Sequence, residues 1–365
     1  MDVMKMMSRN DHEQVVFCRE PELGVKAIIA IHDTTLGPSL GGCRFYPYKS
    51  DEEALNDVLR LSRAMTYKAS IAGLNLGGGK AVIVGNPDTD KNEYLFRAFG
   101  RFVEGLGGRY ITAEDVSTTV RDMEWVRMET GYVTGISQAL GGSGDPSPVT
   151  AFGVFVGIKA ALKIKLGRED LSGIKVAVQG VGHVGYKLCR YLHDDGAELY
   201  ISDVNQDAVD RAMAEFDATQ VDGDIIHATE VDVFAPCALG AVLNDKTIKE
   251  IRAPIIAGAA NNQLAVSNKH GAALLKRGLL YAPDYAINAG GLINVANELE
   301  GYNRERAFRQ AEGIYYTLME IFKKSEEASI PTNQASDQLA EERLRSVAKI
   351  KTFYTSGPGR TARGG

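Results

Sequence analysis

Apolar positions along the chain repeat with the periods of strands and of helices in turn. Two short β-like runs, residues 14–18 and 25–31, are separated by a turn and predict a hairpin. A helix is predicted from Asp51, where acidic residues lie at its positive end. Its apolar stripe recurs at spacings of three and four through Ala54, Val58, Leu61, Met65 and Lys68. Lys68 therefore falls on the face that this helix buries.

The rest of the first half alternates strands with helices, which predicts an α/β layer. Three consecutive glycines, residues 77–79, come before a strand predicted at 81–84. A helix is expected at 93–106 and another strand at 110–113. Glycine and proline then crowd into residues 141–148, and we place the hinge between two domains there.

The second half predicts a mostly parallel, doubly wound sheet. A helix at 151–165 leads into a strand at 174–179, a glycine-rich turn and a further helix. Later strands are expected at 198–202, 231–234, 253–257 and 279–281, with helices at 207–216 and 245–251. Two helical stripes, within 308–322 and 335–347, are expected to be core or subunit interface.

Composition and charge exclude several classes of protein. With 44% hydrophobic and 24% charged residues, the chain has the make-up of an ordinary globular protein rather than a disordered one. The 41 basic and 47 acidic residues form no basic run, so nucleic acid is not an expected partner. There is no secretory signal and no apolar stretch long enough to span a membrane, which favours a cytoplasmic location. The four cysteines form no Cys-x-x-Cys pair, so reduced thiols and no metal site are expected.

The glycine-rich turn after the strand at 174–179 predicts a dinucleotide site. In its Gly-x-Gly-x-x-Gly pattern, glycine permits the tight turn, the approach of a pyrophosphate and the packing of helix against strand. Free N–H groups at the start of the next helix would hold the phosphates. The cofactor-binding residues predicted here are Gly180, Val181, Gly182, His183, Val184 and Gly185.

An acidic residue after the next strand bears on the choice between the two nicotinamide cofactors. Asp203 follows Gly180 by 23 residues, where a carboxylate is expected to bind the ribose hydroxyls. It would repel the 2′-phosphate of NADP, and the following Val204 and Asn205 bring no arginine to neutralise it. We therefore predict NAD as the cofactor.

Two lysines and an aspartate outside this motif are candidates for chemistry. Lys68 on a buried stripe is costly unless an anion neutralises it, because burial disfavours the charged ammonium. Lys80 follows three glycines, where backbone can approach a small ligand closely, and Asp115 follows a strand-like segment. Each alone could be an ordinary surface or ion-pair residue, and their combination indicates a site.

Seven motifs in order resemble the amino-acid dehydrogenases of the glutamate, leucine, phenylalanine and valine group, most of all the leucine dehydrogenases. The resemblance extends from about residue 12 to about residue 350. The motifs are LGPSLGG at 36–42, MTYK at 65–68, GGGK at 77–80, TAED at 112–115, DPSP at 145–148, GAANNQ at 258–263 and APDYAINAGG at 282–291.

The resemblance implies a reversible, NAD-dependent oxidative deamination of an L-amino acid to a 2-oxo acid, with release of ammonium and without a metal. Lys80 would be the general acid/base that activates water. Asp115 would accept from the substrate ammonium and take the second proton-transfer role. Lys68 would hold the substrate carboxylate, aided by the backbone of Gly41 and Gly42.

Further site residues follow from the same resemblance. Substrate contacts are expected from Leu40, Met65, Ala113, Asn262, Asn288, Leu292 and Val295. Additional cofactor contacts are expected from Thr150, Val204, Ala238, Ala259 and Asn261.

The expected fold is α/β with two domains separated by a cleft. Residues 1–144 are assigned to an N-terminal α/β domain for substrate binding and oligomerisation, which residues 330–365 are expected to rejoin. Residues 145–329 are assigned to a Rossmann-type doubly wound NAD domain. The resemblance also implies a homo-oligomer, and by the family's pattern an octamer.

The pocket residues favour a branched aliphatic substrate. Leu40 and Val295 stand where glutamate-specific relatives carry a lysine and a serine, so a side-chain carboxylate would be buried without a partner. Ala113 stands where phenylalanine-specific relatives carry glycine, and its methyl should narrow the pocket. We predict leucine first, with overlap onto valine and isoleucine.

Three alternatives stay open. An aromatic amino-acid dehydrogenase is one, because GLIN at 291–294 also resembles that pattern. A 2-hydroxy-acid dehydrogenase would share the cofactor fold, but no motif here fits its histidine base. A non-catalytic NAD-sensing protein would be expected to have lost Lys80 or Asp115, and both are present.

Overall fold

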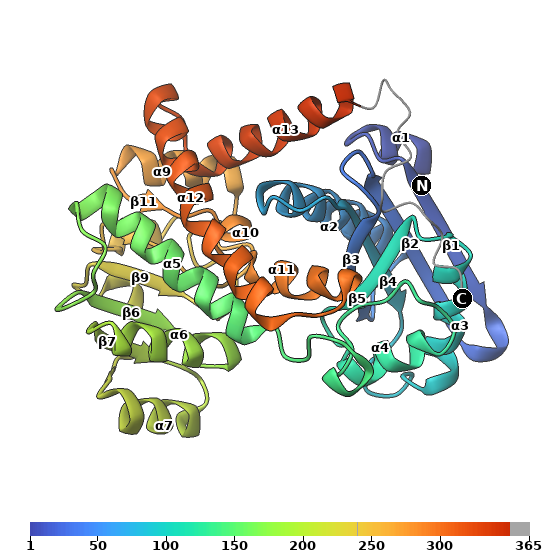
Figure 1. Ribbon diagram of the computed structural model, residues 1–365, viewed down its shortest axis with the longest axis horizontal. Coiled ribbons are helices and arrows are strands. Elements are labelled where there is room, and N and C mark those ends of the chain that lie inside the picture. Colours follow the sequence, from blue (N-terminus) through green and yellow to red (C-terminus); the bar gives the residue numbers. More distant parts are fainter. Residues whose placement is uncertain (239, 351–365) are drawn as a thin grey trace.

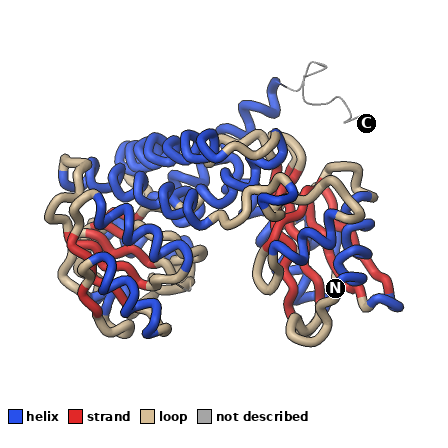
Figure 2. Tube along the Cα trace, turned by 60° about the horizontal axis from the view of Figure 1, so that its bottom comes forward, coloured by secondary structure: helices blue, strands red, loops and turns tan. Residues whose placement is uncertain are grey.

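The computed structural model describes residues 1–238 and 240–350 (Figure 1). It contains two β-sheets in separate lobes, with long helices running along one side of both (Figure 2). This is the two-domain α/β arrangement that the alternation of strands and helices predicted.

The first sheet has five strands in the order β1-β2-β4-β3-β5. β2 pairs antiparallel with β1 and with β4, and β3 pairs parallel with β4 and with β5. Helices α1 and α2 cover one face, and α3 and α4 cover the other. The strands are β1 (Gln14–Glu20), β2 (Val25–Asp33), β3 (Ser39–Tyr46), β4 (Gly77–Val84) and β5 (Tyr110–Glu114); the helices are α1 (Val3–Ser8), α2 (Asp51–Ile71), α3 (Glu93–Glu104) and α4 (Val120–Arg127).

The second sheet has six strands, all parallel, in the order β11-β10-β9-β6-β7-β8. This confirms the predicted doubly wound sheet. Its strands are β6 (Lys175–Gln179), β7 (Glu198–Ser202), β8 (Thr219–Gln220), β9 (Val233–Pro236), β10 (Ile255–Ile256) and β11 (Leu280–Tyr281). Its helices are α5 (Ser147–Leu166), α6 (His183–Asp194), α7 (Gln206–Phe216), α8 (Thr247–Glu250), α9 (Ser267–Lys276), α10 (Asp284–Ile287) and α11 (Gly290–Ala296).

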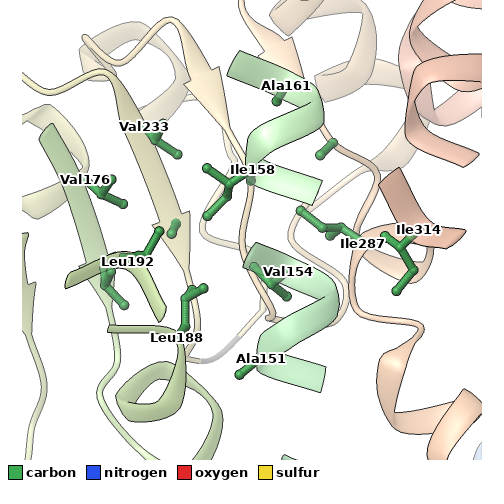
Figure 3. Packing of buried hydrophobic residues seen from close by; sticks show 14 of the residues in the cluster. Ala151, Val154, Ile158, Ala161, Val176, Leu188, Leu192, Val233, Ile287 and Ile314 are labelled. Carbon is green, nitrogen blue, oxygen red and sulfur yellow. The ribbon is translucent and has the colours of Figure 1, made fainter. Parts of the chain in front are cut away.

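Helix α5 is buried between the second sheet and helix α12 (Arg304–Ala328) (Figure 3). Val154 and Ile158 face the same core as Val176 and Val233 of the sheet. Gly153 and Gly157 of α5 let neighbouring helices approach. A Cβ at Gly153 would lie 2.6 Å from Ile314 of α12, and a Cβ at Gly157 would lie 2.6 Å from Ile287 of α10. Each apolar side chain buried here contributes roughly 1.5–3 kcal/mol to folding.

The last helix, α13 (Thr332–Ile350), runs from α12 back to α2 (Figure 1). The Arg343 guanidinium donates to the carbonyls of Ser70 and Leu74 at 3.0 and 2.7 Å. Tyr67 of α2 donates to Glu341 at 2.9 Å. The domain limits at 144/145 and the return of 330–365 stay predictions, and residues 351–365 lie outside the described residues.

The largest local difference from the sequence analysis concerns β3 and β4. No strand was predicted over Ser39–Tyr46, where glycines interrupt the apolar run. β4 begins at Gly77 rather than at residue 81, so the three glycines lie inside the strand. The reason is steric, because a Cβ at Gly78 would lie 2.1 Å from the backbone nitrogen of Thr66 in α2. The helix packs directly on strand backbone there.

This close packing predicts a stability cost for a single methyl group. We expect Gly78→Ala to lower the free energy of unfolding by about 1–3 kcal/mol, since the new Cβ must displace helix α2. Gly131→Ala is the matched control, because a Cβ there meets nothing within 4 Å. We expect that variant to stay within about 0.5 kcal/mol of the unsubstituted protein in urea unfolding. Equal stability of the two variants would contradict this account of the α2–β4 contact.

Candidate active site

Lys80 and Asp115 form an ion pair at the sheet of the first domain. Lys80 lies on β4 and is 5% exposed, and its Nζ is 2.9 Å from Asp115 Oδ1. Arg44 on β3 donates from Nε to the other oxygen of Asp115 at 3.0 Å. Burial would raise the pKa of Asp115, but the charges of Lys80 and Arg44 outweigh it and hold this pKa below its ordinary value. Asp115 is therefore an ionised carboxylate held between two cations.

Lys68 lies near this pair on the last turns of α2. Its Nζ donates to Asn288 Oδ1 at 2.7 Å. Burial lowers the pKa of Lys68 to about 8; the carboxylate of Asp284 opposes this shift and the ammonium of Lys80 adds to it. This direction is the one expected for an ammonium on a partly buried helix face.

Asn288 connects Lys68 to a loop of the second domain. Its amide nitrogen donates to Asn261 Oδ1 at 2.7 Å and to the carbonyl of Ala259 at 3.0 Å. The neighbouring Asn262 adopts a left-handed backbone with φ of 52°, an uncommon conformation for a residue other than glycine. Predicted substrate and cofactor residues thus meet at one junction.

An apolar cluster joins the two domains beside the lysines. Leu40 of β3 and Met65 of α2 contact the same cluster as Leu292 and Val295 of α11. Ala113 lies on β5, directly paired with Gly42 of β3, and is 5% exposed. Leu76 and Ile111 complete the buried set, together with Ala69. Four of the predicted substrate residues, Leu40, Met65, Leu292 and Val295, therefore lie together.

Glycines are required where this site is assembled. A Cβ at Gly41 would lie 1.7 Å from the carbonyl oxygen of Gly79 on the neighbouring strand. A Cβ at Gly42 would lie 2.7 Å from the Cβ of Asp115. Any side chain at either position would push the strands apart and displace the Lys80–Asp115 pair.

The glycine-rich turn has the shape that a dinucleotide phosphate requires. Gly180 has a φ of +97°, and a Cβ at Gly185 would lie 1.9 Å from the carbonyl oxygen of Gly180. A Cβ at Gly182 would meet nothing within 4 Å, so the turn opens there. Gly182 precedes α6, and no side chain of the described residues caps that helix. These features fit an anion held by the helix N-terminus.

The other predicted cofactor residues border this turn or the junction below it. Asp203 accepts from the Val181 backbone nitrogen at 2.7 Å, so its carboxylate faces the glycine turn. Val204 and His183 are exposed, and Val184 is half-buried. Ala238 is exposed beside Gly180, and Thr150 of α5 lies against Gly291, where a Cβ would be 2.9 Å from its Oγ1.

Three charged residues of this region escaped the sequence analysis. Asp284 lies inside the APDYAINAGG motif, so that motif contained a signal for it. Arg44 lies two residues beyond the LGPSLGG motif. Glu298 accepts from the backbone nitrogens of Gly135 and Ser143 at 3.1 and 2.9 Å. Because those residues are more than 150 positions away along the chain, only the fold could show this contact.

Two negative findings apply to the described part of the chain. Residues 1–238 and 240–350 bring together no group of three His, Cys, Asp or Glu side chains that could hold a metal ion. Over the same residues, no helix combines the length and apolar character needed to cross a membrane.

Comparison with known proteins gives concordant matches. Residues 12–132 match the family described as Glu/Leu/Phe/Val dehydrogenase, dimerisation domain. Residues 141–206 and 201–356 match Glutamate/Leucine/Phenylalanine/Valine dehydrogenase.

Individual relatives cover nearly the whole chain. Leucine dehydrogenase of Bacillus subtilis is 55% identical over 97% of this chain and 97% of its own. Phenylalanine dehydrogenase of Bacillus thermotolerans is 49% identical over 95% of this chain and 92% of its own. The crystal structure of L-tryptophan dehydrogenase from Nostoc punctiforme superposes with a TM-score of 0.86 at 48% identity, covering 95% of this chain and 99% of that one.

The desolvation of Lys68 predicts a pH-dependent stability change. The pKa of Lys68 is about 8 in the folded protein and 10.5 ordinarily, so between these values the unfolded chain binds more protons. The cost of burying the ammonium is therefore complete below pH 8 and fades as pH rises towards 10.5. We expect Lys68→Met to be more stable than the unsubstituted protein by about 1–3 kcal/mol at pH 7.

Urea unfolding between pH 6.5 and 10 measures this difference. The stability gain of Lys68→Met should shrink as pH rises above 8. Lys323→Met is the control, because that side chain is 74% exposed and its nearest carboxylate is 3.8 Å away. A gain that is independent of pH, or one that Lys323→Met shares, would show that burial of the Lys68 charge is not its cause.

Proposed function

The chain belongs to the Glu/Leu/Phe/Val dehydrogenase family, and from this premise we propose that it oxidatively deaminates L-leucine and other branched-chain L-amino acids with NAD. The observation that carries the proposal is the Lys80–Asp115 ion pair, with a second ammonium at Lys68 and an uncharged apolar cluster beside it. Two cations, one carboxylate and an apolar wall match the carboxylate, ammonium and side chain of an aliphatic amino acid.

Substrate binding uses the charges already described. Lys68 would bind the substrate carboxylate, exchanging its hydrogen bond to Asn288 for a charged partner. The backbone of Gly41 and Gly42 lies on the strand between Lys80 and Asp115 and would complete this contact. Asp115 would accept a hydrogen bond from the substrate ammonium.

Proton transfers then follow in a defined order. The substrate ammonium first loses a proton to the Lys80–Asp115 pair, so that its lone pair can form a C=N bond. The glycine turn, residues 180–185, would hold NAD, which would supply the acceptor for the hydride that leaves Cα. Once the pair has passed that proton and the Lys80 proton to bulk water, neutral Lys80 takes a proton from the attacking water while the water oxygen adds to the iminium carbon, and Lys80 is an ammonium again.

Collapse of this carbinolamine completes the reaction. The Lys80 ammonium gives its proton to the carbinolamine nitrogen, the C–N bond breaks to release ammonia, and Lys80 takes the hydroxyl proton as the carbonyl forms. Ammonia then takes one proton from bulk water and leaves as ammonium. The products are the 2-oxo acid, ammonium, NADH and one proton. Exclusion of water by closure of the two domains would protect the iminium until Lys80 delivers the water.

The apolar cluster supports a branched aliphatic side chain over glutamate. A second carboxylate placed against Leu40, Leu292 and Val295 would be buried without a cation, at a cost of several kcal/mol. Discrimination among leucine, isoleucine and valine should be small, because one methylene changes binding by only about 1–3 kcal/mol. Phenylalanine or tryptophan is the second candidate substrate, since a phenylalanine dehydrogenase and an L-tryptophan dehydrogenase are 49% and 51% identical to this chain.

The choice of NAD over NADP is part of the same proposal. Asp203 presents its carboxylate to the glycine turn and would repel a 2′-phosphate. Of the nearby arginines, Arg190 pairs with Glu215 and Arg211 stacks on Tyr186, so both cations already have partners.

Assembly and location complete the proposal. The match of residues 12–132 to a dimerisation domain supports a homo-oligomer, and we propose an octamer. The four cysteines, Cys18, Cys43, Cys189 and Cys237, are all free, which fits a reducing cytoplasm.

A substrate panel tests this function directly. Purified protein should reduce NAD with leucine, isoleucine and valine at higher kcat/KM than with phenylalanine, tryptophan or glutamate, and NADP should be a poor substitute. Lys80→Ala should lower kcat/KM by a factor of at least ~100, the lower end of the contribution that a general acid/base makes to the rate. A preference for aromatic substrates would move the assignment to the second candidate. Absence of turnover with every amino acid would refute the proposed function.

A further inference from the structure

Arg44 is the only cation in the described chain that links Asp115 to a second carboxylate. Its Nε lies 3.0 Å from Asp115 Oδ2, and its Nη1 lies 2.8 Å from Asp57 Oδ2. The three side chains are only 17–22% exposed. Tyr48 donates to the same oxygen of Asp57 at 2.7 Å. Asp57 on α2 therefore fixes the orientation of the Arg44 guanidinium, and Tyr48, from the segment between β3 and α2, holds Asp57 in place.

The two oxygens of Asp115 have different partners. Oδ2 is held by Arg44, and Oδ1 is held by Lys80 at 2.9 Å. The backbone nitrogen of Asp115 donates to Thr118 Oγ1 at 2.8 Å, which fixes the end of β5. Asp115 Oδ1 is therefore the oxygen that lies on the side of the Lys80 ammonium.

Two lysines and one arginine face Asp115. Lys80 on β4 would give up its proton in the proposed reaction, and burial lowers the pKa of Lys68 on α2 to about 8. The other titratable groups that sense Asp115 are the Cys43 thiol on β3 and the Tyr110 phenol on β5, and burial raises the pKa of both. Only the Arg44 guanidinium keeps its charge at every pH at which the protein is folded.

We propose that Arg44 is a positioning residue that keeps Asp115 ionised, and its Oδ1 turned to the substrate ammonium, while Lys80 gives up its proton. This inference rests on the function proposed above. In this proposal Arg44 is the partner of Asp115 that always keeps its charge, and Lys80 is the partner that loses and regains a proton. Without the fixed partner, a neutral Lys80 would leave the carboxylate partly buried with no adjacent cation, and protonation of Asp115 would become favourable.

The chain offers a matched control for the loss of an arginine here. Arg60 also donates to Asp57, from Nη2 to Oδ1 at 2.8 Å. Its side chain is 56% exposed, and no hydrogen bond or ion pair joins it to Asp115. Replacement of Arg60 therefore removes the same charge from the same aspartate without removing the contact to Asp115.

The experiment compares pH profiles of kcat/KM for leucine in R44Q, R44K, R60Q and the unsubstituted protein. R44Q should lose about 10- to 100-fold at neutral pH, the scale for a charge-assisted hydrogen bond, and its acid limb should move to higher pH. R44K keeps the charge and should keep the acid limb in place while losing part of kcat/KM through its different geometry. R60Q should behave as the unsubstituted protein, and NADH affinity should be unchanged in all three.

Two results would overturn the inference. One is a loss in R44Q that is equal at every pH, which indicates a structural role alone. The other is a profile of R60Q that matches R44Q. If R44Q does not fold, R44K and Asp57→Asn provide the test. The inference requires each of them to lower kcat/KM more than R60Q does, and an equal or smaller loss would overturn it.

A second readout separates this inference from the proposed function. Melting temperatures of R44Q, Asp115→Asn and the double variant should be non-additive, because the two side chains contact each other. Additive losses would overturn the inference whether or not leucine is a substrate. Lack of turnover by the unsubstituted protein would refute only the proposed function.

Discussion

Two ammonium groups close together in one partly buried site are the constraint on which this site depends. Lys68 and Lys80 repel each other, and burial alone already lowers the pKa of Lys68 to about 8. The protein can hold both because Asp115 is paired with Lys80 and Asp284 lies close enough to Lys68 to oppose the shift. The remaining imbalance at Lys68 is what a substrate carboxylate would relieve. The site is thus prepared for an anion before the anion arrives.

The same site is divided between two domains. Asn288 accepts a hydrogen bond from Lys68 and donates one to Asn261, so the helix that carries Lys68 is connected to a loop of the second domain. The apolar cluster likewise takes Leu40 from β3 and Val295 from α11. A substrate bound between them would contact both domains at once. Its binding therefore favours closure through direct contacts, without any distant relay.

Sequence patterns predicted the parts of this site that are local. Gly180 and Asp203 were found because a strand, a turn and a helix must follow one another, and Lys68 because helical spacing placed it on a buried stripe. Arg44 was missed because its importance depends on strand order: β3 lies between β4 and β5, which brings Arg44 beside Asp115 across 71 residues of sequence. Glycines hid the first half of β4, since residues 77–79 serve packing against α2 rather than strand propensity.

The most direct test of the account measures proton uptake when a carboxylate binds. The ligand is 4-methylpentanoate, which carries the carboxylate and side chain of leucine without its amino group. Calorimetry in buffers of different ionisation enthalpy, with NAD present, should show uptake of a fraction of a proton at pH 8–9, since the carboxylate raises the pKa of Lys68 from about 8. Uptake should vanish at pH 6.5 and in Lys68→Met. Binding without uptake near pH 8.5, or equal uptake in Lys68→Met, would contradict the claim that Lys68 is the prepared anion site.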